Sequence, residues 1–285
     1  MDPSQIDLPP LGVASLLKNY HLTPKKGLGQ NFLADSSALR RIVESAEIPA
    51  GGCVLEVGPG LGSLTRYLAQ VARKVVAVEL DGEMIPILKE VLAPWKNVEI
   101  IQNDILNTDP AALMGENGYY VVANIPYYIT SAVIRHLLEA KIKPARLVLT
   151  VQREVADRIC AKPGDMSLLA LSVQVYGAPR VATRIPAGAF YPPPKIDSAA
   201  VRVDLYHEPL IPAAWLDDFF RLAKAGFSQK RKMLRNSLAG GLGISNEQAA
   251  GLLEHAAVEG TRRAETLTLS EWSALTAVWR QVKTG

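Results

Sequence analysis

The sequence has little of what marks the specialised protein classes. Among its 285 residues there are two cysteines, Cys53 and Cys160, and aromatic residues make up 6%. Two cysteines are too few for a disulfide framework or a four-cysteine zinc site, so we expect both to be reduced and structural, and no metal site. No apolar run approaches the length of about 18 residues that can span a bilayer, and we expect no membrane segment.

The chain also lacks a large excess of charge of either sign. The chain has 31 Lys and Arg against 28 Asp and Glu, a net charge of +3, which excludes a strongly basic protein but leaves RNA or DNA as partners. Residues 1–208 carry 21 charges of each sign, whereas residues 209–285 carry 10 basic and 7 acidic ones. The first residues, Met1 to Asp7, lack the basic and apolar regions of a secretory signal. We therefore expect a cytoplasmic protein.

Hydrophobic residues make up 48% of the chain, and their pattern predicts an α/β fold. Between Cys53 and Leu205, short apolar runs alternate with helix-like stretches, and helix starts are indicated at Asp35 and Thr130. Nearly continuous apolar runs are typical of parallel strands that are covered on both faces. The expected strands are Cys53–Val57, Val75–Val78, Val98–Ile101, Tyr119–Ala123 and Arg146–Val151.

The last third of the chain has a different pattern. Two further strands are expected at Arg180–Ile185 and Ser198–Leu205, and their short Pro-rich link permits an antiparallel pair. Beyond Glu208 helical patterns dominate, and the expected helices are Trp215–Phe227, about Lys230–Leu238, Ser245–His255 and Ser270–Val282. We therefore predict an N-terminal extension (1–24), an α/β domain (25–208) and a small all-helical domain (209–285).

A glycine-rich loop follows the first predicted strand, in the segment Glu56–Thr65. Glycines allow a sharp turn and a close approach to a ligand, and Glu79, which ends the second strand, can accept both hydroxyls of a ribose. Gly62 follows Gly58 by four residues rather than the five of the dinucleotide fingerprint, and the loop has no Lys-Ser/Thr pair of a P-loop. The pattern resembles that of S-adenosyl-L-methionine-dependent methyltransferases. The alternative is a tight turn without a ligand.

Two more polar residues end predicted strands on the same sheet edge. Asp104 ends the third strand and could accept the amino group of a cofactor adenine, although such an Asp more often caps a helix or a turn. Asn124 ends the fourth strand. In open α/β folds ligands bind at this edge, so we expect these residues to share a site with the glycine loop.

Asn124-Ile125-Pro126-Tyr127 resembles the Asp/Asn-Pro-Pro-Tyr/Phe motif of enzymes that methylate exocyclic amino groups of bases. An adenine amino group is a poor nucleophile because its lone pair is delocalised into the ring. The Asn124 side-chain oxygen and the backbone carbonyl of Ile125 or Pro126 can accept its two hydrogens, and Tyr127 can stack on the base. Such a base cannot stay in a duplex. Alternatively, Asn124 caps the following helix, and Pro126 and Tyr127 are turn and core residues.

With these motifs, the chain from Lys26 to its end resembles the ribosomal RNA adenine N6-dimethyltransferases. Within them it resembles the bacterial small-subunit enzymes, which dimethylate two adjacent adenosines near the 3′ end of 16S rRNA. Two further signatures match, Leu28–Leu33 and Ala189–Ala199. The resemblance implies a class I methyltransferase fold, Rossmann-like with a mostly parallel seven-stranded sheet, and a small all-helical C-terminal domain. It also implies S-adenosyl-L-methionine as cofactor and 16S rRNA in an immature 30S subunit as partner, and we expect a monomer.

The resemblance assigns roles to particular residues. It implies that Phe190 sandwiches the target base opposite Tyr127; the alternative is an aromatic ring that anchors the Pro-rich turn. Tyr128 stands where many relatives have Asn, which leaves the details of base entry open. The residues implied in cofactor binding are Gln30, Asn31, Leu33, Gly58, Gly60, Glu79, Asp104 and Asn124.

The predicted helical domain contains a basic run formed by Lys230, Arg231, Lys232 and Arg235. By itself such a run is usually a solvated helix face, but the resemblance indicates contacts with RNA phosphates. Two other functions stay open. One is a large-subunit 23S rRNA adenine methyltransferase of the macrolide-resistance type, and the other is a ribosome-assembly factor whose binding role outweighs catalysis. The glycine spacing disfavours a nicotinamide-dependent dehydrogenase.

Overall fold

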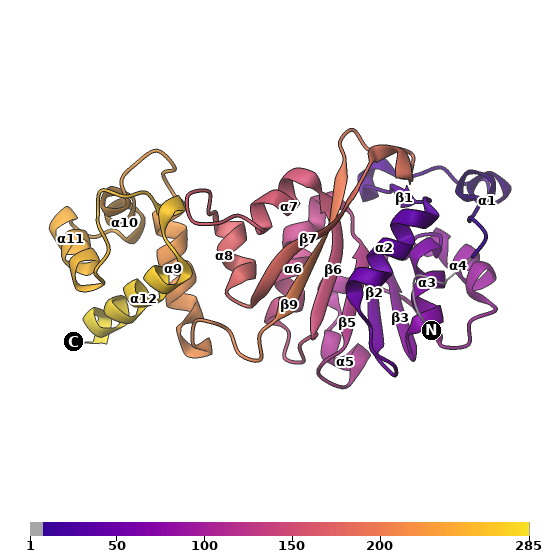
Figure 1. The fold of residues 1–285 in the computed structure, drawn as a ribbon, viewed down its shortest axis with the longest axis horizontal. Coiled ribbons are helices and arrows are strands. Elements are labelled where there is room, and N and C mark those ends of the chain that lie inside the picture. Colours follow the sequence, from indigo (N-terminus) through magenta and orange to yellow (C-terminus); the bar gives the residue numbers. More distant parts are fainter. Residues whose placement is uncertain (1–7, 285) are drawn as a thin grey trace. The chain divides into compact units, whose positions relative to one another are not determined.

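A computed structural model describes residues 8–284 of the chain. The chain divides into two compact units (Figure 1). Unit 1 consists of Met1–Ala156 and Pro179–Leu205, and unit 2 of Asp157–Ala178 and Tyr206–Gly285. Residues 157–178 therefore pack with the helical unit, although they lie inside the predicted 25–208 domain.

Unit 1 is built on a seven-stranded sheet with the strand order β4-β3-β2-β5-β6-β9-β7. β2 pairs in parallel with both β3 and β5, whereas β6 and β9 are antiparallel. All seven strands predicted from the sequence are confirmed, and β7 and β9 are neighbours. The strands are β2 (Cys53–Val57), β3 (Lys74–Glu79), β4 (Val98–Gln102), β5 (Tyr120–Asn124), β6 (Arg146–Gln152), β7 (Gly177–Ile185) and β9 (Ser198–Leu205).

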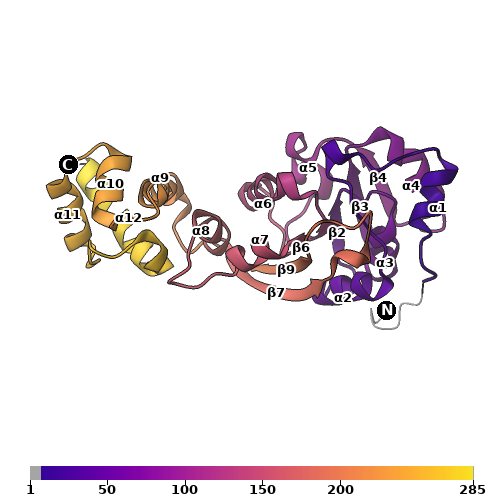
Figure 2. The ribbon, with the colours of Figure 1, turned by 90° about the horizontal axis from the view of Figure 1, so that it is seen from above.

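Helices cover both faces of this sheet. Figure 2 shows α2 and α3 on one face and α6 on the other. The Asp35 side chain caps α2 by accepting a hydrogen bond from the amide of Ala38 at 2.7 Å, as the predicted helix start requires. The apolar stripes of α2 and α3 pack on the buried side chains of the central strands and form the main core. The helices are α2 (Ser36–Ala46), α3 (Ser63–Val71), α4 (Ile85–Leu92), α5 (Pro110–Met114), α6 (Thr130–Glu139) and α7 (Arg153–Ile159), which ends in unit 2.

The N-terminal extension contains a helix that we did not predict, α1 (Val13–Asn19). Val13 and Leu17 are buried in a cluster with Met84 and with Leu88 of α4. The Arg66 guanidinium also donates two hydrogen bonds to the carbonyl of Pro9, both at 3.1 Å. From Leu8 onward the extension is therefore part of unit 1, and its residues 1–7 lie outside the described residues.

A second unpredicted element is a two-stranded ribbon of β1 (Phe32–Leu33) and β8 (Phe190–Tyr191). The strands are antiparallel, with Leu33 opposite Phe190. Just beyond the ribbon, the amide of Ala34 donates to the carbonyl of Ala189 at 2.9 Å. The ribbon thus pairs the end of the signature Leu28–Leu33 with the signature Ala189–Ala199.

Unit 2 is helical, and its core contains the wholly buried Phe219 and Trp272. The predicted helix that starts at Ser245 is confirmed, and it begins with a capping box formed by Ser245 and Gln248. The helix predicted from about Lys230 begins instead at Leu234, because residues 228–233 form the turn before it. The helices are α8 (Leu168–Gln174), α9 (Leu216–Phe227), α10 (Leu234–Leu242), α11 (Asn246–His255) and α12 (Leu269–Thr284).

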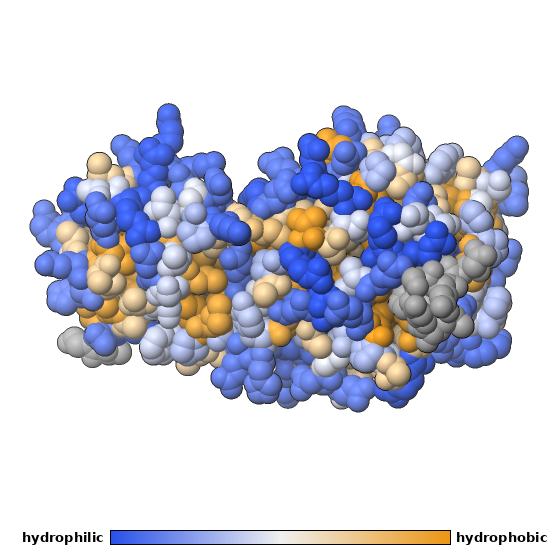
Figure 3. All heavy atoms as spheres, viewed as in Figure 1, coloured by the Kyte–Doolittle hydropathy of each residue, from blue (hydrophilic) through white to orange (hydrophobic). Residues whose placement is uncertain are grey.

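Hydrophilic residues cover most of the face drawn in Figure 3, and the apolar residues gather in separate areas. Within residues 8–284, no helix combines the length and the apolar character needed to cross a membrane.

The packing of α1 gives a testable expectation. Leu17→Ala removes a buried side chain from the cluster with Met84 and Leu88, and we expect a loss of about 2–4 kcal/mol of stability around α4. Hydrogen exchange of the amides in α4 should become faster by the corresponding factor. Lys18→Ala, at the exposed neighbouring position, is the control. Unchanged exchange in the Leu17 variant would contradict the assignment of α1 to unit 1.

Candidate active site

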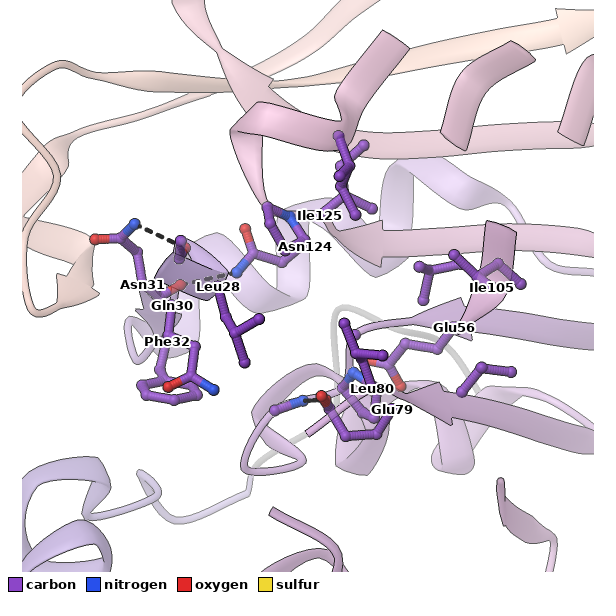
Figure 4. A pocket seen from close by; sticks show the side chains of 18 of the residues that line it. Leu28, Gln30, Asn31, Phe32, Glu56, Glu79, Leu80, Ile105, Asn124 and Ile125 are labelled. Carbon is purple, nitrogen blue, oxygen red and sulfur yellow. Dashed lines mark hydrogen bonds between the residues drawn. The ribbon is translucent and has the colours of Figure 1, made fainter. Parts of the chain in front are cut away.

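A cavity lies at the carboxyl ends of the parallel strands β2 to β5, where open α/β folds bind ligands. Its walls are the ends of these strands, the glycine loop and part of the N-terminal segment, a name used here for residues 25–33 (Figure 4). Of the residues that the sequence assigned to catalysis and cofactor binding, all but Phe190 line it. These are Gln30, Asn31, Leu33, Gly58, Gly60, Glu79, Asp104, Asn124, Pro126 and Tyr127.

The glycine loop follows β2, and its backbone conformation favours glycine at three positions. Gly58, Gly60 and Gly62 have φ angles of 68°, 59° and 84°, in the region that side chains disfavour. A Cβ on Gly60 would also lie 2.9 Å from the ring of Phe32. The loop and the N-terminal segment therefore approach each other as closely as they do because position 60 has no side chain.

The Glu79 carboxylate is held by backbone amides at the end of β3. One oxygen accepts from the amide of Asp81 at 2.8 Å and the other from the amide of Gly60 at 2.9 Å. Burial raises the pKa of Glu79, and these backbone hydrogen bonds oppose the rise. Each oxygen keeps a second lone pair, so the group can still accept a hydrogen bond from a ligand in the cavity.

Asp104 caps a short helix and also lies in the wall of the cavity. Its side chain accepts hydrogen bonds from the amide of Leu106 at 2.9 Å and from the side chain of Asn107 at 3.2 Å, and so caps the 3₁₀ helix Ile105–Asn107. It also lines the cavity. The cap fixes the carboxylate without removing it from the site.

The Asn124 side chain reaches the N-terminal segment rather than the helix that follows it. Its amide nitrogen donates to the carbonyl of Asn31 at 3.0 Å (Figure 4). No side chain caps α6, so the alternative in which Asn124 caps that helix is wrong. Because the nitrogen is engaged, the amide oxygen is the atom left to accept a hydrogen bond. The Pro126 carbonyl accepts from the amide of Ile129 at 3.2 Å, which favours the Ile125 carbonyl as the second acceptor.

Tyr127 has a hydroxyl partner that the sequence did not reveal. The Tyr127 and Ser198 hydroxyls are 2.6 Å apart, and Ser198 is completely buried at the start of β9. Burial raises the pKa of Tyr127, and the hydrogen bond opposes the rise. The neighbouring Tyr128 also lines the cavity but is 59% exposed. The sequence signal for Ser198 was its place in the late signature.

Phe190 does not take the place that the resemblance implied. Its side chain is 4% exposed and packs in the main core with Leu33 and Ala189. The pairing of β1 with β8 turns the ring into that core, so Phe190 is not a wall of the cavity in this structure. The alternative, an aromatic residue that anchors the Pro-rich turn, agrees with this packing.

Glu56, in the glycine-loop motif, is a buried acid to which the sequence gave no role. It is 1% exposed and lines the cavity, and its Oε2 atom has no hydrogen-bond partner among the described residues. Burial raises its pKa to about 8, the nearby Glu79 adds to the rise, and the Thr65 hydroxyl opposes it. The hydroxyl of Ser63, another lining residue, is likewise unpartnered within the described chain. The cavity thus offers polar atoms that a polar ligand would satisfy.

The basic run lies in unit 2, at the beginning of α10. Lys230, Arg231 and Lys232 are in the turn before the helix, and Arg235 is in its first turn. All four are exposed, and none forms an ion pair with another described residue. Strongly hydrophilic residues stand out above the loop between α9 and α10 (Figures 1 and 3). These four cations are available to a polyanion.

The chain is similar to known proteins over most of its length. Residues 22–275 match the model of a family described as ribosomal RNA adenine dimethylase. A ribosomal RNA small subunit methyltransferase A from Dehalococcoides mccartyi is 46% identical over 267 residues, which cover 93% of this chain and 92% of that protein. The crystal structure of the 23S rRNA methyltransferase ErmE has a TM-score of 0.70 and 30% identity, covering 88% of this chain and 100% of that one.

A dimethyladenosine transferase from Plasmodium falciparum has a TM-score of 0.74 and 24% identity, covering 88% of this chain and 98% of that one. At this level of sequence identity, the similarity shows only that the two proteins share a fold. Together the two solved structures confirm the predicted methyltransferase fold.

The buried carboxyl of Glu56 predicts a pH dependence of stability. Between about pH 5 and pH 8 the folded protein holds a proton on Glu56 that the unfolded chain has lost, because the pKa in the fold is about 8. The free energy of unfolding should therefore fall as the pH rises through this window, by at most about 1.4 kcal/mol per pH unit. Glu56→Gln should remove this contribution, as measured by urea unfolding at several pH values.

The control for this measurement is Glu154→Gln, which changes an exposed acid on α7. It should keep the pH dependence of the unmodified protein. An equal pH dependence in the Glu56 variant and the unmodified protein would show that Glu56 is charged in the fold.

Proposed function

The chain belongs to the ribosomal RNA adenine dimethylase family, and we propose that it transfers methyl groups from S-adenosyl-L-methionine to N6 of two adjacent adenosines near the 3′ end of 16S rRNA. The products are N6,N6-dimethyladenosines, formed by stepwise transfer, and the reaction takes part in the biogenesis of the small subunit. The observation that carries the proposal is the convergence of the motif residues on one cavity, with the Asn124 amide oxygen left to accept.

As the substrate, the small ribosomal subunit is favoured over the large one, because the relative named for the small subunit is more similar to this chain. The relative named for the small subunit is 46% identical, whereas the 23S rRNA methyltransferase is 30% identical. A role in assembly alone would not need a cavity lined by both the glycine loop and the Asn124 motif. Catalysis is therefore the main function, and binding to the precursor particle can accompany it.

The residues of the cavity suit S-adenosyl-L-methionine, which supplies an electrophilic methyl group on a sulfonium. Glu79 would accept the ribose hydroxyls, and Asp104 would accept the adenine amino group. Asn31, Leu33 and the glycine loop would contact the rest of the cofactor. The unpartnered atoms of Glu56 and Ser63 add polar partners inside the same cavity.

The target adenine is activated by position rather than by a strong base. The Asn124 oxygen and the Ile125 carbonyl accept the two amino hydrogens, which directs the nitrogen lone pair toward the methyl group. The Tyr127 ring stacks on the base and stabilises the positive charge that develops on it. The alkylated ammonium is acidic enough to lose its proton to water. The base reaches this position only from a single-stranded, looped or flipped nucleotide.

Unit 2 would dock the enzyme on the particle. Lys230, Arg231, Lys232 and Arg235 are exposed and would contact RNA phosphates. The small net charge of +3 suggests that recognition depends on the shape of the immature 30S subunit more than on general attraction to RNA. We propose that the enzyme acts as a cytoplasmic monomer without a membrane partner.

The particle assignment is tested with labelled cofactor. Immature 30S subunits and 50S precursors are incubated separately with the protein and methyl-labelled S-adenosyl-L-methionine, and the label is mapped by nuclease digestion. We expect label on two adjacent adenosines of 16S rRNA. Label found only in 50S material would overturn the small-subunit assignment.

The role of Asn124 is tested by Asn124→Ala. This change removes the oxygen that accepts an amino hydrogen, and we expect the single-turnover rate to fall by at least about 100-fold. The dissociation constant of the cofactor, measured by calorimetry, should change little. Asn19→Ala, at an exposed position of α1, serves as the control. Substantial transfer by the Asn124 variant would remove this residue from the mechanism.

A further inference from the structure

Asp81 is a buried acid that stands behind the cavity rather than in it. It follows β3 and Leu80, and its side chain is 4% exposed, yet it is not a lining residue. Its carboxylate accepts three hydrogen bonds, from Lys25 Nζ at 2.8 Å, from Gln30 Nε2 at 2.8 Å and from the amide of Glu83 at 3.2 Å. The proposed mechanism gives the Asp81 carboxylate no part in the reaction. Its role therefore depends on the parts of the structure that these hydrogen bonds hold in place.

Two of the three donors come from the N-terminal segment. Lys25 and Gln30 flank the 3₁₀ helix Lys26–Leu28, and each donates to a different oxygen of Asp81. The Gln30 side-chain oxygen accepts from the amide of Lys25 at 2.8 Å, which closes the turn between them. Both ends of the Gln30 amide are therefore engaged within the protein. Gln30 also lines the cavity, and the cofactor contact that the resemblance implied for it stays a prediction.

Asp81 is also bonded to the glycine loop through its own backbone. Its amide donates to one oxygen of Glu79 at 2.8 Å, and the other oxygen of Glu79 accepts from the amide of Gly60 at 2.9 Å. A continuous series of hydrogen bonds thus runs from the glycine loop through β3 to the N-terminal segment. A shift of any one of these elements would strain the others.

The residue after Gln30 carries the contact that matters for the reaction. The Asn31 carbonyl accepts the hydrogen bond from the Asn124 amide nitrogen at 3.0 Å. If the amide were flipped, two oxygens would face each other without a proton between them, so the Asn31 carbonyl selects the orientation that leaves the Asn124 oxygen to accept. The position of that carbonyl depends on the anchoring of Gln30.

The charge of Asp81 suits this task. Burial by itself would raise its pKa, but the hydrogen bonds from Lys25 and Gln30 hold the pKa below its ordinary value. Asp81 is thus ionised at neutral pH and accepts charge-assisted hydrogen bonds, which are the stronger kind. Lys25 also pairs with Glu83, which is half-exposed and contributes less.

We infer that Asp81 is a positioning residue for methyl transfer: by anchoring Gln30, it holds the Asn31 carbonyl where that carbonyl orients the Asn124 amide toward the target amino group. The inference rests on the proposed function and adds a residue outside the cavity to it. A misplacement of the carbonyl by about 1 Å would lower the rate of the chemical step, because a positioned acceptor loses its effect over such distances.

The test uses an exchange of donor and acceptor between positions 30 and 81. Gln30→Glu places a second carboxylate against Asp81, and we expect kcat to fall about 10-fold or more, with the dissociation constant of S-adenosyl-L-methionine changed by less than about threefold. Gln30→Glu combined with Asp81→Asn restores a hydrogen bond with the donor and acceptor reversed, and kcat should recover to within about threefold. Glu83→Gln, which changes the other acidic partner of Lys25, should leave kcat within about twofold.

Three results would overturn the inference. They are a normal kcat in the Gln30→Glu variant, a loss that the second substitution does not recover, and a loss that appears wholly as weaker cofactor binding. A merely structural role would lower the unfolding temperature without this pattern of loss and rescue in kcat. Failure of the proposed function is distinguishable, because the unmodified protein would then transfer no methyl group to immature 30S subunits; that result would overturn the inference as well.

Discussion

Parallel pairing of β2 with both β3 and β5 is the constraint on which the rest of the site depends. In this register Val57 lies opposite Val78, so the glycine loop leaves the sheet beside the end of β3. The amide of Gly58 donates to the carbonyl of Val78 at 2.9 Å, which extends the pairing into the loop. On the other side β5 ends at Asn124. The chemical groups of the site are therefore brought together by backbone pairing, before any side chain contributes.

Acidic side chains concentrate at this edge of the sheet, and each is stabilised in a different way. Backbone amides hold Glu79, the N-terminal segment holds Asp81, and burial favours the neutral form of Glu56. Three uncompensated carboxylates so close together would repel one another. Because each acid is stabilised separately, the three can lie close together at this edge of the sheet without that repulsion.

The parts of this structure that local sequence determines could be predicted, and those set by distant partners could not. Most residues of the strands β2 to β6 are apolar, and the residues at the strand ends follow from the topology. Gln30 and Asp81 lie 51 residues apart, so no local pattern joins them. Phe190 was misplaced for the same reason, because its environment is decided by pairing with Leu33. The helix predicted from about Lys230 begins only at Leu234, because the charges of the basic run are compatible with a helix, whereas the chain turns at residues 228–233.

The ribbon of β1 and β8 has a consequence for how the enzyme is made. When β5 has left the ribosome, the nascent chain already contains the glycine loop, Asp81 and Asn124. The partner of Leu33 is Phe190 and that of the Tyr127 hydroxyl is Ser198, and both are synthesised more than 60 residues later than Asn124. The antiparallel partner of β6 is β9, which is likewise synthesised later. Because pairing between distant segments is the slow step of folding, a chain still in synthesis has the chemical groups of the methyltransferase without its finished site. The site in unit 1 is therefore complete only once the chain as far as β9 has been synthesised.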